Sequence, residues 1–157
     1  MTIDAANELV PLNPAYITTT RIASAIGLAP LLIVAGVLEA AQRLPPGSFF
    51  LPALALYTFL VLVVPARKYR RWGYAMGTDR LRIVRGYMVF RDTVVPFGRI
   101  QHIDVDQGPL DRRYGLAKLT VHTAGNHNST VALPGLVHTD ALAMREAIRA
   151  AIRQDVL

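Results

Sequence analysis

One uncharged apolar run, the nineteen residues from Ser48 to Ala66, constrains this chain more than any other feature. A helix of about 20 apolar residues matches the hydrocarbon thickness of a bilayer. Directly after the run comes a basic cluster, here called the collar, which consists of Arg67, Lys68, Arg70 and Arg71. The run is therefore predicted to cross a membrane, and the collar marks the point where the chain leaves it.

A second uncharged run, the seventeen residues from Ile22 to Leu38, precedes the first. It is long enough for a short span. The alternative is a buried helix of a soluble protein, but a chain of 157 residues has no core large enough to cover two such runs. The link from Gln42 to Gly47 is short and contains two prolines. Residues 21–71 are therefore predicted to form an antiparallel transmembrane hairpin that ends in the collar.

The orientation of this hairpin follows from the positive-inside rule, because Lys and Arg near the ends of spans stay in the cytoplasm. The collar has four basic residues, whereas the link has only Arg43. Both termini are predicted to be cytoplasmic, in a multi-pass protein of the inner (plasma) membrane. Residues 1–20 have no basic residue and no continuous apolar segment. They are predicted to form a short arm rather than a secretory signal.

The remaining residues, 72–157, have the pattern of a small soluble domain. Short β-rich segments such as Leu81–Val84 and Leu119–Thr123 alternate with turns. Apolar residues then recur at helical spacing from Asp140 to Gln154. We expect a meander of about seven antiparallel strands followed by one C-terminal amphipathic helix. One helical turn is predicted between Pro109 and Gly115, since Pro favours the first helical position and Gly the position after the last.

Four short motifs between residues 95 and 125 make this order more specific: Arg99-Ile-Gln101, Gln107-Gly-Pro-Leu110, Arg112-Arg-Tyr-Gly-Leu116 and His122-Thr-Ala-Gly125. They resemble a bacterial membrane-anchored pleckstrin-homology (PH) domain family, in which two transmembrane helices precede one PH-like domain. The resemblance implies a mainly-β soluble domain, a partly open barrel of two packed sheets capped by the final helix. Members of this family often occur beside a larger membrane protein with several copies of the domain, which makes such a neighbour the leading partner candidate.

The composition leaves little room for catalysis. The chain has no cysteine, which excludes disulfides, thiolate metal sites and thiol nucleophiles. Residues 72–157 contain one serine and one glutamate, so a serine triad or a glutamate acid/base pair lacks members. We expect no enzyme activity and no cofactor.

The net charge of +6 is unevenly distributed, because residues 67–157 hold fifteen basic and eight acidic residues. Nucleic acid is not expected as a partner, since the sequence indicates neither a recognisable reader fold nor exposed aromatic residues interleaved with the basic ones. His102, Asp104 and Asp106 share one face of a predicted strand, within reach of a common cation. A solvated strand face is the favoured interpretation, with a metal site and a partner-binding strand as the alternatives.

Two classes of function remain. In the first, the domain is a non-catalytic interaction module or scaffold for another membrane protein, with a homo-oligomer left open. The candidate contacts are Gln107, Pro109, Arg112, Arg113 and Tyr114. The alternative for Arg112 and Arg113 is an ion pair with Asp111 or Asp106 that only holds the loop. In the second class, the collar, with Arg80, Arg82 and Arg85 as further candidates, binds anionic lipid headgroups at the membrane surface, where each basic side chain contributes about 1 kcal/mol. The alternative for the collar is that it only sets the membrane topology.

Overall fold

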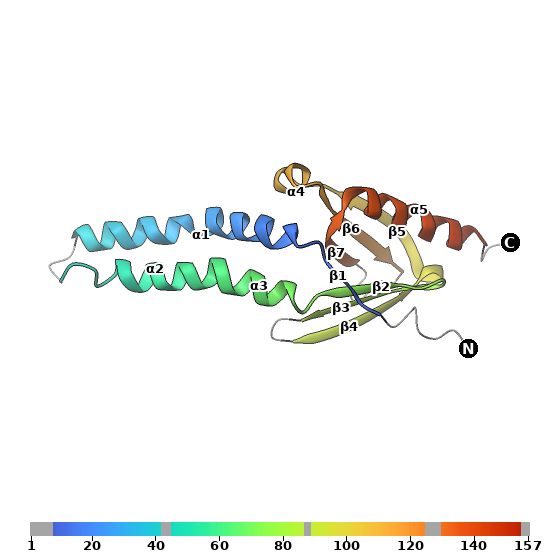
Figure 1. Cartoon of the computed structure of the whole chain (residues 1–157), viewed down its shortest axis with the longest axis horizontal. Helices are drawn as coiled ribbons and strands as arrows, with labels where there is room; N and C mark the ends of the chain where they lie inside the picture. Colours follow the sequence, from blue (N-terminus) through green and yellow to red (C-terminus); the bar gives the residue numbers. More distant parts are fainter. Residues whose placement is uncertain (1–7, 42–44, 87–88, 125–129, 155–157) are drawn as a thin grey trace.

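The computed structural model describes residues 8–41, 45–86, 89–124 and 130–154. A long helical hairpin projects from one end of a β-rich domain (Figure 1). Helix α1 spans Ala15–Ala41. The returning helix, Phe50–Tyr69, consists of α2 (Phe50–Thr58), a π-helical segment η1 (Phe59–Val63) and α3 (Val64–Tyr69).

Both helices of the hairpin are long and apolar enough to cross a membrane. Only 6% and 11% of their most apolar stretches are buried, whereas the core helix of a soluble protein would be mostly buried. At the far end of the hairpin, the Glu39 carboxylate accepts hydrogen bonds from the backbone N–H groups of Gly47, Phe49 and Phe50. These bonds close the turn between the two helices and satisfy N–H groups that begin α2.

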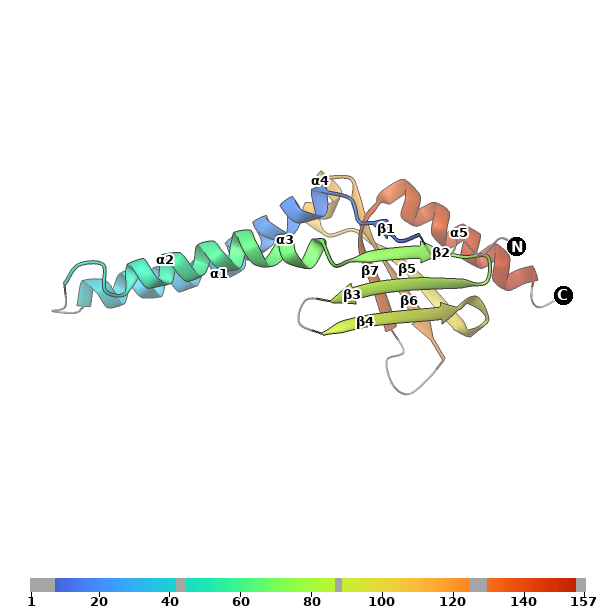
Figure 2. The ribbon, with the colours of Figure 1, turned by 60° about the horizontal axis from the view of Figure 1, so that its bottom comes forward.

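Two antiparallel sheets form the domain. The first has the order β1 (Val10–Pro11), β2 (Gly73–Met76), β3 (Arg80–Gly86) and β4 (Phe90–Pro96), and the second has the order β5 (Ile100–Asp106), β6 (Leu116–Thr123) and β7 (Thr130–Val137). The short helices η2 (Phe97–Arg99) and α4 (Pro109–Arg113) join strands, and α5 (His138–Gln154) ends the described chain. Figure 2 shows β2, β3 and β4 as one layer with the second sheet behind it.

The core lies between the two sheets and under α5. Leu81 and Ile83 of the first sheet and Leu119 and Val121 of the second are fully buried in it. Helix α5 contributes Ala141, Met144 and Ile148, whose spacing places them on one face. The predicted fold class, a membrane hairpin followed by a PH-like domain of about seven strands with a C-terminal helix, is confirmed.

The seventh strand comes from the segment before the hairpin. Strand β1 pairs with β2, with Val10 opposite Tyr74, and Leu12 is only 2% exposed in the core. The backbone N–H of Asn13 donates to the Gly135 carbonyl of β7 at 2.9 Å. All of the about seven strands were predicted after residue 72, whereas the described part of that region contains six. A two-residue strand has no periodicity of its own, so only its distant pairing partner reveals it.

Contacts around the arm also join the two ends of the hairpin to the domain. The Tyr69 hydroxyl, at the end of α3, donates to the Leu12 carbonyl at 2.8 Å. Gly135 has a positive φ of 70°, and a Cβ atom there would lie 2.8 Å from Cγ of Tyr16 in the first turn of α1. Only glycine allows β7 to approach α1 this closely. Both helices therefore meet the domain at fixed positions.

Removal of the Leu12 side chain tests whether the arm is part of the domain. We expect Leu12→Ala to lower the free energy of unfolding by about 2–5 kcal/mol, because it leaves a cavity in a closed core. Val10→Ala is the matched control, since Val10 is 47% exposed. Thermal unfolding of the full chain in mild detergent, followed through its single tryptophan, measures the difference. Equal midpoints for the two variants would contradict an integral role for the arm.

Candidate interaction surface at the membrane-proximal end

The collar lies between the second helix and the domain. Arg67 and Lys68 belong to the last turn of α3, where the helix dipole favours positive charge. Arg70 and Arg71 follow directly, and Trp72 then leads into β2. Arg67, Arg70 and Arg71 are exposed. The collar thus lies at the end of the domain from which the helical hairpin projects.

Two neighbouring cavities open beside the collar. The larger, of about 600 Å³, has apolar walls from Leu9, Pro11, Trp72 and Phe90, and it also contacts Arg70 and Arg71. The smaller, of about 250 Å³, is lined by Lys68, Trp72, Arg85, Gly86, Val89 and Arg91. Val89, Phe90 and Arg91 were not among the predicted site residues. Their signal was an apolar pair at the end of a β-rich segment, followed directly by a basic residue.

The α4 turn, residues 107–115, contains the predicted protein contacts. The Asp111 carboxylate accepts the backbone N–H of Gly108 at 3.3 Å, and Gly115 ends the helix with a φ of 66°. Gln107 donates through Nε2 to the Leu116 carbonyl at 2.6 Å, so its side chain holds the base of the turn. The predicted helical turn between Pro109 and Gly115 is therefore present.

The candidate contact residues Arg112, Arg113 and Tyr114 are all exposed on this turn. Among the described residues, neither arginine forms an ion pair with Asp111 or Asp106. Asp106 lies instead 3.6 Å from the Lys118 ammonium. The guanidinium groups are thus not used to hold the loop in the described part of the chain.

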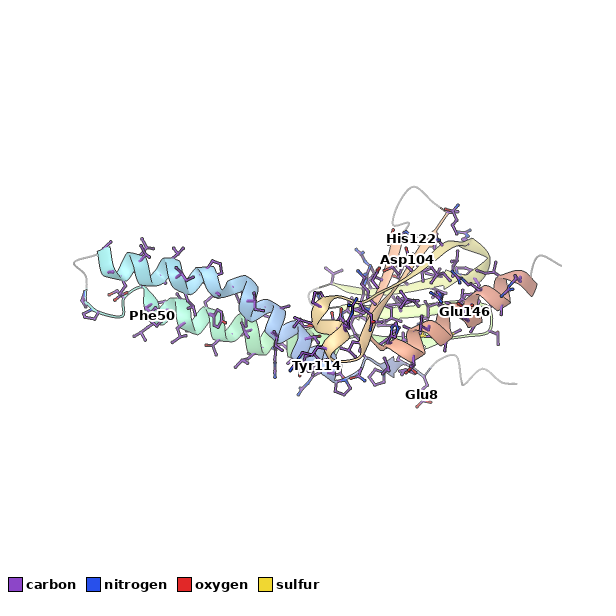
Figure 3. All side chains as sticks on the ribbon, turned by 90° about the horizontal axis from the view of Figure 1, so that it is seen from above. Glu8, Phe50, Asp104, Tyr114, His122 and Glu146 are labelled. Atoms are coloured by element: carbon purple, nitrogen blue, oxygen red, sulfur yellow. The ribbon has the colours of Figure 1, made fainter. Side chains whose placement is uncertain are left out.

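The α4 turn lies beside the beginning of α1. A third cavity, of about 320 Å³, separates them, with Tyr16, Thr20 and Ala23 of α1 on one side and Pro109 and Leu110 on the other. Figure 3 shows Tyr114 at the junction between the hairpin and the domain. The α4 turn and the collar therefore both belong to the membrane-proximal end of the domain.

The face formed by His102, Asp104 and Asp106 lies elsewhere, on the second sheet. Asp104 is paired with two imidazoles, at 2.8 Å from Nε2 of His102 and 3.3 Å from Nε2 of His122 (Figure 3). The side chains of these three residues are 39–65% exposed. Within the described residues, no group of three or more His, Cys, Asp or Glu side chains is arranged to hold a metal ion. The Asp104–His102 pair lies within β5, whereas the Asp104–His122 pair joins β5 to β6, and both pairs are on an exposed face of the second sheet.

Comparison with known proteins agrees with this architecture. Residues 18–152 match the family described as Bacterial PH domain. The chain belongs to this family, as the sequence motifs predicted. No solved structure matches it.

Two curated relatives come from Bacillus subtilis (strain 168). The chain is 32% identical over 88 residues to UPF0699 transmembrane protein YdbS, a match covering 56% of this chain and 54% of the relative. It is 28% identical over 102 residues to UPF0699 transmembrane protein YdbT, covering 63% of this chain and 21% of the relative. The chain thus spans about half of one relative and about a fifth of the other. Both are named as transmembrane proteins, which agrees with the two apolar helices.

One ion pair on the outer side of β3 and β4 predicts a pH dependence. The Arg82 guanidinium bonds to the Asp92 carboxylate at 2.6 Å, and these hydrogen bonds hold the pKa of Asp92 below its usual value. A carboxylate with a lowered pKa stabilises the fold above its unfolded-state pKa of about 3.9, and this contribution is lost as the pH falls through the folded-state value.

Asp92→Asn should therefore lower the thermal midpoint of the full chain modestly at neutral pH, because the charged pair is partly exposed. The difference from the unsubstituted chain should shrink as the pH falls below about 4, and it should disappear once the pH is below the lowered folded-state pKa of Asp92. The measurement is thermal unfolding in mild detergent across this pH range. A difference that stays constant down to acid pH would show that the ion pair is not its cause.

Proposed function

We propose that this chain is a multi-pass protein of the inner membrane, with both termini in the cytoplasm, whose PH-like domain is a non-catalytic interaction module. Its partner in this proposal is a neighbouring membrane protein that carries related PH-like domains. The main supporting observation is the α4 turn, which presents Arg112, Arg113 and Tyr114 without described ion pairs beside the beginning of α1. A protein embedded in the same membrane would reach this turn without a long extension.

The charge distribution supports the proposed orientation. The collar holds four basic residues at the domain end of the hairpin, whereas Arg43 is the basic residue of the link at the other end. The positive-inside rule then favours a cytoplasmic domain. The segment before α1 lies on the same side, because β1 pairs with β2 of the domain. This pairing requires both ends of the hairpin to face one compartment.

The relatives support the proposal that the partner is a membrane protein with related PH-like domains. The match to YdbT covers 21% of that protein, so a unit like this one also occurs within a much longer transmembrane chain. We infer that a short chain like this one associates with a longer one for two reasons. The family resemblance implies that the two often occur side by side, and the α4 turn is exposed. The scaffold role is supported by the shortage of catalytic side chains in the sequence.

Anionic lipid is the second candidate ligand. The observation that favours it is the pair of cavities beside the collar, where basic side chains border apolar walls. Such a combination suits a molecule with a negative headgroup and apolar chains. The lipid site and the α4 turn involve different residues, so the two candidates are separable by mutation.

Affinity purification of the full chain from its native cell in mild detergent, with mass spectrometry, tests the protein-interaction proposal. We expect a co-purifying membrane protein near equal stoichiometry. Arg112→Ala with Arg113→Ala should reduce its recovery severalfold, because truncated interface arginines weaken binding. Arg149→Ala with Arg153→Ala is the control, since it removes two exposed arginines of α5. Unchanged recovery with the first pair would exclude the α4 turn as the contact.

A further inference from the structure

The hairpin between β3 and β4 carries an unusual pair of exposed residues at its end. Val89 is 72% exposed and Phe90 is 74% exposed, the highest values among the large apolar side chains of the described residues. Val89 borders the smaller cavity beside the collar, and Phe90 borders the larger one. Exposing two adjacent apolar side chains to water costs free energy, and contact with another apolar surface would remove this cost.

The strand register places this hairpin end at the level of the collar. Gly73 pairs with Val84, and Phe90 pairs with Gly86, two residues further along β3. At about 3.4 Å per residue, Phe90 lies roughly 7 Å beyond the start of β2 along the strands. Figures 1 and 2 both show this end of β3 and β4 on the side of the domain that faces the helical hairpin.

This level corresponds to the headgroup layer of a bilayer. From Ala66, the last residue of the apolar run, helix α3 rises by about 4.5 Å to its last residue, Tyr69, and Arg70 and Arg71 follow directly. The headgroup layer is about 5–7 Å thick on each side of the hydrocarbon. If the apolar run ends at the hydrocarbon boundary, then Val89 and Phe90 lie among lipid headgroups.

The charges around the hairpin end point to an anionic occupant. Arg85 and Arg91 are directly opposite each other in the ladder between β3 and β4. Like charges in such a pair repel, yet neither side chain has a described carboxylate partner. Arg82, on the same strand as Arg85, is paired with Asp92. Lys68 adds a third positive charge to the cavity that contains Arg85 and Arg91. A phosphate between these groups would relieve their repulsion.

We propose that the end of the β3–β4 hairpin is a second membrane contact, in which Val89 and Phe90 enter the lipid interface while Lys68, Arg85 and Arg91 bind anionic phospholipid headgroups. The contact belongs to the leaflet in which the second helix ends. This inference rests on the lipid candidate above and does not depend on the α4 turn.

A second copy of the chain is the competing occupant of this surface. Both copies in one membrane would have the same orientation and would bring their Lys68, Arg85 and Arg91 groups toward one another. That arrangement concentrates positive charge at the contact without any described carboxylate to offset it. Anionic lipid supplies the complementary charge, and it is present wherever the hairpin spans a membrane.

The absence of cysteine allows a direct test with one label on the full chain. Val89→Cys carries an environment-sensitive fluorophore, and Val94→Cys is the matched control, since Val94 is in β4, the strand that begins directly after Val89, is 48% exposed and lies further from the helical hairpin. The protein is placed in vesicles of phosphatidylcholine, with or without phosphatidylglycerol, that contain a lipid-borne quencher. We expect quenching at position 89 severalfold above that at position 94, and stronger with phosphatidylglycerol.

The charge requirement is tested by Arg85→Gln with Arg91→Gln in the Val89→Cys background. Two basic groups near an anionic surface change the equilibrium of the contact by about thirtyfold, so the enhancement by phosphatidylglycerol should be lost. This variant should fold, because it removes a repulsive pair, and an unchanged thermal midpoint checks this. Arg112→Ala with Arg113→Ala should leave the quenching unchanged, which separates this inference from the protein-interaction proposal.

Three outcomes would overturn the inference. Equal, weak quenching at positions 89 and 94 in both vesicles would show that the hairpin end does not touch lipid. Strong quenching that changes neither with phosphatidylglycerol nor in the glutamine variant would show that anionic headgroups are not part of the contact. A fluorophore at position 89 that becomes protected only as the protein concentration rises in detergent would identify a second copy of the chain as the occupant.

Discussion

The pairing of β1 with β2, together with the burial of Leu12, is the constraint on which the arrangement of this protein depends. The entire helical hairpin is inserted between these two adjacent strands. Both ends of the hairpin are consequently held by one sheet, and the Tyr69 hydroxyl adds a direct bond to the arm. Since the strand pairing and the core resist rearrangement, the domain cannot rotate freely about a single linker.

This double attachment determines which surfaces face the membrane. The α4 turn lies beside the beginning of α1, and the β3–β4 hairpin end lies beside the end of α3. The two surfaces differ in chemistry, because the first presents arginines on a short polar turn and the second combines arginines with exposed apolar side chains. The first suits a protein neighbour and the second suits the lipid interface, so both can operate in one molecule.

Several features were predictable from local sequence because their signals are local. The apolar runs and the collar indicated the helical hairpin, and Pro109 and Gly115 bracketed the α4 turn. Other features depend on partners far apart in the chain. Nothing near Leu12 indicates that it enters the core, and the opposition of Arg85 and Arg91 appears only when the register of β3 and β4 is known. The sequence also left open whether an α4 arginine pairs with Asp111 or Asp106, and the described structure shows no such ion pair.

The sequence by itself determined that this chain has two long apolar helices followed by a β-rich domain that ends in a helix, because hydrophobic length, period and turn residues are properties of contiguous segments, and its short motifs indicated the PH-like family. Only the tertiary structure decided how the parts are joined. It placed residues 10–12 in the domain, put Val89 and Phe90 at the level of the collar, and left the α4 arginines exposed beside α1. The physical reason is that strand pairing and core packing bring together residues from distant segments, and local patterns do not specify those partners.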